Sequence, residues 1–84
     1  MDYKSYKYVV FDDKTAIVFP RHEIHREQAA KVKKLPVSAG FVNVSEDGVD
    51  CYGDSYTLGL SSKEGDNEIV KNFLPQWPQT YSTT

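Results

Sequence analysis

Two glycine turns within residues 37–60 restrict the fold of this chain more than any other feature. Residues 46–48 (Glu-Asp-Gly) place a glycine where a three-residue hairpin loop requires a positive φ angle. Residues 53–54 (Gly-Asp) suit a two-residue type II′ turn. Residues 37–60 are therefore predicted to form three short antiparallel strands.

The alternation of side chains predicts which face of each strand is buried. Tyr56, Leu58 and Leu60 alternate with small residues, which places all three on the inner face of the last strand. Val49 and Cys51 occupy the same face of the middle strand. The first strand is apolar on both faces, so we expect it to lie in the centre of the sheet.

The preceding residues predict a hairpin and then a helix. Residues 6–11 and 15–19 are two β-favouring runs, and Pro20 ends the second. Residues 21–35 then change to a helical period and predict one amphipathic helix. Its inner face is predicted to contain Ile24, Gln28, Val32 and Leu35, with His25 and Ala29 on the same side.

A short second helix follows, beginning between Ser61 and Asp66 and ending at Pro75. The predicted order is ββ-α-βββ-α. This order indicates an α+β fold with a mainly antiparallel sheet of about five strands, one longer helix and one short helix. We expect residues 1–75 to form a single domain and residues 76–84 to form an extended tail.

Composition narrows the class of protein. A chain of 84 residues with one cysteine has no internal disulfide, which favours a reducing compartment and predicts a cytoplasmic protein. No apolar run approaches the roughly 20 residues that a membrane helix needs. The formal net charge of −2 provides no general attraction for nucleic acid.

Three groups of residues are candidates for chemistry or nucleic-acid binding. His22 and His25 have the i,i+3 spacing of a metal pair, but a metal site needs three or four ligands, so packing or surface placement is the simpler interpretation. Cys51 is flanked by acidic residues, which disfavours a reactive thiolate. The strand residues Tyr3, Lys4, Tyr6, Lys7 and Tyr8 mix aromatic and cationic side chains, as single-strand binders do, although an ordinary strand is the simpler reading.

Two further groups are candidates for contact with a partner protein. Trp77 and Tyr81 are large aromatic side chains in a tail without periodicity, so they dock either on their own domain or on a partner. The outer face of the predicted first helix is the second candidate and contains Glu23, Arg26, Glu27, Lys33 and Lys34.

Three segments resemble a widespread set of small uncharacterised proteins from tailed phages and prophages. These are AIVFPRHEIHREQA, VSAGFVNV and CYGDSYTLGLSSKEGD. The phage proteins combine a Phe-Pro-x-x-x-x-His helix start, a Ser-Ala-Gly-Phe strand and a Cys-Tyr-Gly-x-Ser-x-Ser-Leu hairpin. The resemblance covers about Tyr8 to Leu74, but residues 56–58 (Tyr-Thr-Leu) lack the second serine. It implies a phage-encoded accessory protein in the host cytoplasm and brings no catalytic residues.

The first hypothesis is therefore a non-enzymatic protein-interaction module without a cofactor, which binds and inhibits a host or phage protein. A small nucleic-acid-binding module and a metal-assisted hydrolase using His22 and His25 are the alternatives. The identity of the protein partner is not readable from the sequence. Exposed sheet edges would also allow pairing between two copies of the chain.

Overall fold

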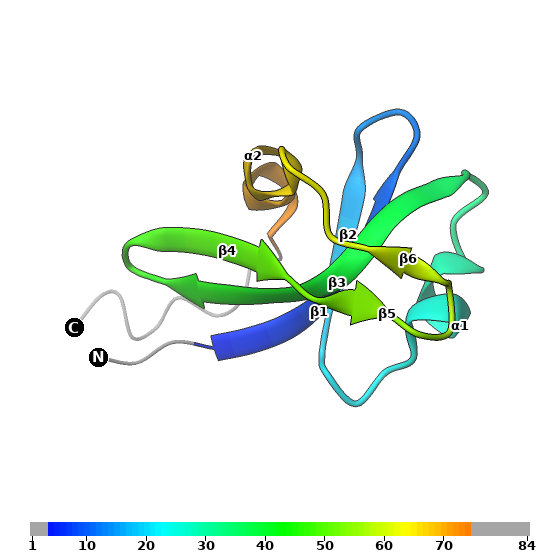
Figure 1. The fold of residues 1–84 in the computed structure, drawn as a ribbon, viewed down its shortest axis with the longest axis horizontal. Helices are drawn as coiled ribbons and strands as arrows, with labels where there is room; N and C mark the ends of the chain where they lie inside the picture. The colour runs from blue at the N-terminus through cyan, green and yellow to red at the C-terminus, as the bar shows by residue number, and fades with distance from the viewer. Residues whose placement is uncertain (1–3, 75–84) are drawn as a thin grey trace.

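The computed structural model describes residues 4–74 and has six strands, two short helices and one 3-10 turn (Figure 1). The elements are β1 (Lys4–Phe11), β2 (Ala16–Phe19), α1 (His25–Ala29), β3 (Pro36–Ser45), β4 (Gly48–Tyr52), β5 (Asp54–Ser55), β6 (Leu60–Ser61), α2 (Asp66–Val70) and η1 (Lys71–Phe73). The predicted α+β class is confirmed. No helix within these residues is long and apolar enough to cross a membrane.

The four longest strands form one antiparallel sheet in the order β2-β1-β3-β4. β3 is hydrogen-bonded on both sides, which confirms the prediction that the first strand of residues 37–60 is central. The β3–β4 hairpin closes at the pair Ser45↔Gly48, and Gly48 has φ 126°. The positive φ predicted for this glycine is confirmed, although the loop has two residues instead of three.

Both faces of the sheet are covered, so the domain has two apolar clusters. The α2-side cluster contains Tyr8, Val10, Ala16, Val42 and Val70. The α1-side cluster contains Val9, Phe11, Phe19, Ala29 and Ala39. Residues of the second half of β1, from Tyr8 to Phe11, alternate between the two faces, as the period of a strand requires. Each buried side chain of the size of valine or phenylalanine stabilises the fold by about 1.5 to 3 kcal/mol.

The first helix is much shorter than predicted. Ile24 is extended, with φ −99° and ψ 129°, and the helix that follows has only five residues. Beyond it, the backbone N–H of Asp12 donates a hydrogen bond of 2.9 Å to the carbonyl of Leu35, which holds the end of this segment beside the β1–β2 hairpin. Ile24 and Leu35 are 41% and 63% exposed, so two residues of the predicted inner face are not buried. Helices this short depend on packing, which His25 and Ala29 provide as the buried residues of α1.

The predicted third strand is also wrong. Residues 54–61 form a separate small hairpin in which β5 and β6 are two residues each. Gly53 does have a positive φ, 77°, but the chain there passes from the main sheet into the small one and does not turn back on β4. By contrast, the second helix begins at Asp66, one of the two predicted positions.

A side chain from α2 covers part of the outer edge of β4. The backbone N–H of Cys51 donates a hydrogen bond of 2.7 Å to Oδ1 of Asn67. In a two-residue hairpin that closes at Ser45↔Gly48, the N–H of every second residue points away from the sheet, and Cys51 is such a residue. Asn67 therefore occupies a donor that an added strand would need.

Candidate binding surfaces

The β5–β6 hairpin carries the most exposed aromatic side chain of the described residues. Its loop is closed by hydrogen bonds from Gly59 N–H to the Ser55 carbonyl, 2.9 Å, and from Leu58 N–H to Ser55 Oγ, 3.2 Å. Ser55 is 2% exposed, whereas Tyr56, the next residue, is 96% exposed. A large aromatic ring is therefore displayed on a loop whose backbone is held by internal hydrogen bonds.

The hairpin is attached to the domain by apolar packing and by a hydrogen bond from α1. Leu58 and Leu60 pack against the α1-side cluster. The backbone N–H of Arg26 in α1 donates a hydrogen bond of 3.3 Å to Oγ1 of Thr57. Figure 1 shows α1, β5 and β6 together at one end of the molecule. A loop fixed in this way loses little conformational entropy when it binds a partner.

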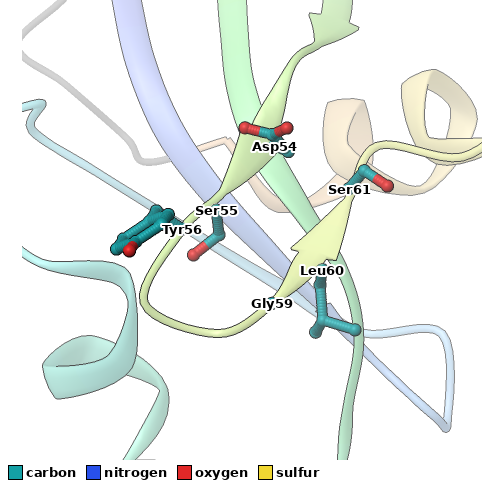
Figure 2. Close-up of a pocket in the computed structure, with 6 residues that line it drawn as sticks. All are labelled: Asp54, Ser55, Tyr56, Gly59, Leu60 and Ser61. Carbon is teal, nitrogen blue, oxygen red and sulfur yellow. The ribbon is translucent and has the colours of Figure 1, made fainter.

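An open hollow of ≈ 330 Å³ lies along this hairpin (Figure 2). Its lining residues are Asp54, Ser55, Tyr56, Gly59, Leu60 and Ser61. Figure 2 shows the ring of Tyr56 extending to one side of the hairpin and the hydroxyl of Ser61 on the other. The lining is a mixture of apolar and hydroxyl or carboxylate groups, which suits contact with a polypeptide surface.

Two of the predicted partner-binding residues lie beside this hairpin. Arg26 and Glu27 are exposed on α1, and the backbone of Arg26 contacts Thr57 in the loop that carries Tyr56. Glu23 is half-buried, and its carboxylate accepts a hydrogen bond of 3.0 Å from Gln28. It belongs to the turn before α1 and not to a helix face.

The other predicted residues of this group lie beyond the end of α1. Lys34 forms an ion pair of 2.8 Å with Asp13 and donates a hydrogen bond of 3.1 Å to Thr15. The hydrogen bonds from Lys34 and Thr15 lower the pKa of Asp13 to about 2. Lys33 is exposed. The five residues predicted to share a helix face are therefore divided among three segments, because the helix ends at Ala29.

A second exposed feature, which we call the cation–aromatic strip, consists of Arg21, Phe41 and Tyr52. The guanidinium carbon of Arg21 lies 4.7 Å from the centre of the Phe41 ring, and Phe41 stacks with Tyr52 at a centroid distance of 5.8 Å. Arg21 Nη1 also donates a hydrogen bond of 2.6 Å to Ser5 Oγ. Tyr52 is 39% exposed. The strip lies on the sheet face of the α1-side cluster.

The residues predicted for nucleic-acid binding do not form one surface. Tyr8 is completely buried in the α2-side cluster, and Tyr6 packs against the same cluster. Lys7 points to the opposite face, where its ammonium donates a hydrogen bond of 2.6 Å to the carbonyl of Glu23. Lys4 is exposed, and Tyr3 lies outside the described residues. Strand alternation therefore places Tyr6 and Tyr8 on the face opposite Lys7, and the ring of Tyr8 is buried.

The two histidines diverge instead of forming a pair. His22 is exposed, with Nε2 3.2 Å from a carboxylate oxygen of Glu23. His25 is buried, and its Nε2 donates a hydrogen bond of 2.8 Å to the carbonyl of Gly40. Burial lowers the pKa of His25, and the charge of Lys7 lowers it further. Within residues 4–74 no three His, Cys, Asp or Glu side chains are grouped as a metal site would require.

A buried polar network connects the two halves of the chain beneath α2. Asp66 is 3% exposed. Its Oδ2 accepts hydrogen bonds from the Tyr8 hydroxyl, 2.5 Å, and from the Lys63 N–H, 3.0 Å. Its Oδ1 accepts a hydrogen bond of 3.0 Å from the Ser38 hydroxyl.

Burial, reinforced by the charge of Asp66, raises the pKa of the Cys51 thiol to about 12. The thiol therefore stays protonated at neutral pH, which does not suit a nucleophile.

Comparison with known proteins gives no match to any family model, any curated protein or any solved structure. Trp77 and Tyr81, the predicted tail anchors, lie outside the described residues. Tyr56 and Arg21 are the exposed candidates that the sequence did not indicate. For Tyr56 the sequence contained an indication of a loop, because Ser55 and Gly59, two residue types common in loops, lie on either side of residues 56–58.

Proposed function

We propose that the protein is a small non-enzymatic protein-interaction module that contacts its partner through the β5–β6 hairpin and the exposed side of α1. The observation that supports this proposal is the 96% exposure of Tyr56 on a loop closed by hydrogen bonds. Tyrosine is enriched among residues whose truncation weakens protein complexes most. Arg26 and Glu27 are exposed on α1, and the backbone N–H of Arg26 is hydrogen-bonded to Thr57, the residue after Tyr56.

We further propose that the chain is a phage-encoded accessory protein that binds and inhibits a host or phage protein in the host cytoplasm. The support for phage origin is the resemblance of the three sequence segments. The support for the compartment is the single cysteine in 84 residues, since small secreted domains usually depend on disulfides.

The test is affinity capture from bacterial lysate with the full chain and two variants. Tyr56→Ala is expected to weaken capture of the partner by about 2 kcal/mol or more, without a change in melting temperature. Leu35→Ala is the matched control. Leu35 is also exposed, but it lies at the end of the segment that joins α1 to β3 and is not part of the β5–β6 hairpin. Capture by Tyr56→Ala at the level of the unmodified chain would rule out the hairpin as the contact surface.

A further inference from the structure

The cation–aromatic strip holds an arginine in a fixed position without a carboxylate partner. Arg21 is held by the ring of Phe41 beneath it and by its hydrogen bond to Ser5. Within residues 4–74 no carboxylate oxygen lies within 4.0 Å of its guanidinium. Four of the five N–H donors of a guanidinium remain after one such hydrogen bond, and their planar arrangement matches two carboxylate oxygens.

The surroundings of the strip provide further polar groups. Lys7 is the cross-strand neighbour of Phe41, so a second cation lies on the same sheet face. The hydroxyl of Tyr52 lies 3.5 Å from Oδ1 of Asn43, which leaves the amide nitrogen of Asn43 as a donor. Asp50 is paired with Asn43 across the strands and is the acidic residue on this face of β4. Positive charge is therefore concentrated toward Arg21 and Lys7.

We propose that the strip binds a carboxylate in an acidic segment of a partner protein. The guanidinium of Arg21 donates two parallel hydrogen bonds to the carboxylate, and the ring of Tyr52 packs against the neighbouring side chain of the partner segment. This site is separate from the Tyr56 loop and does not depend on the function proposed for that loop. A fixed arginine loses less freedom on binding than a mobile one, so its two parallel hydrogen bonds contribute more to affinity.

An acidic peptide fits the strip better than a nucleic-acid strand does. Arg21 covers the Phe41 ring and Tyr52 stacks on it, so Phe41 is not free to stack on a base. Single-strand binders instead offer successive free rings and a continuous cationic groove.

The proposal is tested by NMR titration of the isotope-labelled full chain with three probes. These are a capped peptide of alternating glutamate and leucine, the same peptide with glutamine in place of glutamate, and a single-stranded oligothymidylate. The glutamate peptide is expected to shift the Nε–H signal of Arg21 and the side-chain amide signals of Asn43. The glutamine peptide and the oligothymidylate are expected to leave them unchanged.

Variants then separate charge from geometry. Arg21→Ala is expected to weaken binding of the glutamate peptide about tenfold or more, and Arg21→Lys to weaken it several-fold because the charge remains but the fork is lost. Lys31→Ala, which removes an exposed lysine in another segment, is the control and should bind the glutamate peptide normally.

Equal binding of the glutamate and glutamine peptides, or the absence of any shift in the Arg21 and Asn43 signals, would overturn the proposal. Arg21-dependent binding of the oligothymidylate alone would identify a nucleic-acid site instead. A normal titration by Tyr56→Ala would show that this site stands apart from the hairpin.

Discussion

The hydroxyl of Tyr8 donates a hydrogen bond of 2.5 Å to Oδ2 of Asp66, joining residues 58 positions apart in the sequence. Tyr8 lies in a central strand, and Asp66 is the first residue of α2. The same carboxylate accepts from Ser38 in β3 and from the backbone of Lys63. One buried acidic group therefore fixes α2 to both central strands.

Tyr8→Phe is expected to destabilise the fold by about 1.5 to 3 kcal/mol, because it removes a buried hydrogen bond to a carboxylate and keeps the ring. The measurement is urea unfolding. Tyr56→Phe is the matched control, since Tyr56 is almost fully exposed, and should change the free energy of unfolding by less than about 0.5 kcal/mol. Equal effects of the two variants would contradict the role assigned to Asp66.

Acidification is expected to destabilise the protein through His25. Burial lowers its pKa below the usual 6.5, so the unfolded chain binds a proton at a higher pH than the folded chain does. The free energy of unfolding should therefore be unaffected by His25 above about pH 6.5 and fall as the pH decreases below it. Unfolding curves from about pH 8 to about pH 5 measure this effect.

Two variants assign this pH dependence. His25→Gln removes the titrating group and should flatten the slope between these pH values. His22→Gln removes the exposed histidine and should leave the slope as it is. If His22→Gln flattened the curve and His25→Gln did not, the attribution to the buried ring would be wrong.

Cys51 is expected to react slowly with thiol reagents in the folded protein. Its pKa is raised to about 12, mainly by burial, so very little thiolate exists at about pH 8. Reaction with a chromogenic disulfide reagent should be many-fold faster in denaturing urea than in buffer. Similar rates in the two solutions would show that the thiol is accessible and ionised.

Gly40→Ala is expected to reduce the free energy of unfolding by more than about 3 kcal/mol, beyond the usual cost of overpacking. An added Cβ would lie 2.4 Å from the Tyr52 carbonyl oxygen, so β3 and β4 would have to separate. Gly59→Ala is the comparison. An added Cβ there meets open space, so only the strain of the alanine backbone at a φ of 68° should reduce the free energy of unfolding, by about 1 to 2 kcal/mol. A larger loss for Gly59→Ala would refute the steric argument.

The sequence was sufficient where local chemistry decides the structure. The glycine at position 48 predicted the β3–β4 hairpin, and apolar residues on both faces of β3 predicted its central place. The β1–β2 hairpin and the start of α2 at Asp66 followed from similar local signals.

The sequence failed where distant residues compete with a local pattern. A helical period over residues 21–35 could not reveal that the carbonyl of Leu35 accepts a hydrogen bond from Asp12. The alternation around Tyr56 suggested an inner face, but the small hairpin uses Leu58 and Leu60 for packing and displays the tyrosine. Contacts such as Tyr8 with Asp66, or Arg21 with Phe41, have no signature in neighbouring residues.

The hydrogen bond from Cys51 to Asn67 limits how copies of this chain can assemble. Pairing of copies through sheet edges stays a prediction, but the two edges of the main sheet are not equivalent. A chain that joined at β4 would first have to displace Asn67, whereas the outer edge of β2 has no side-chain hydrogen bond of this kind within the described part of the chain. If two copies pair through β2, the combined sheet has a β4 strand with its Asn67 bond at each outer edge, which opposes further growth into a fibre.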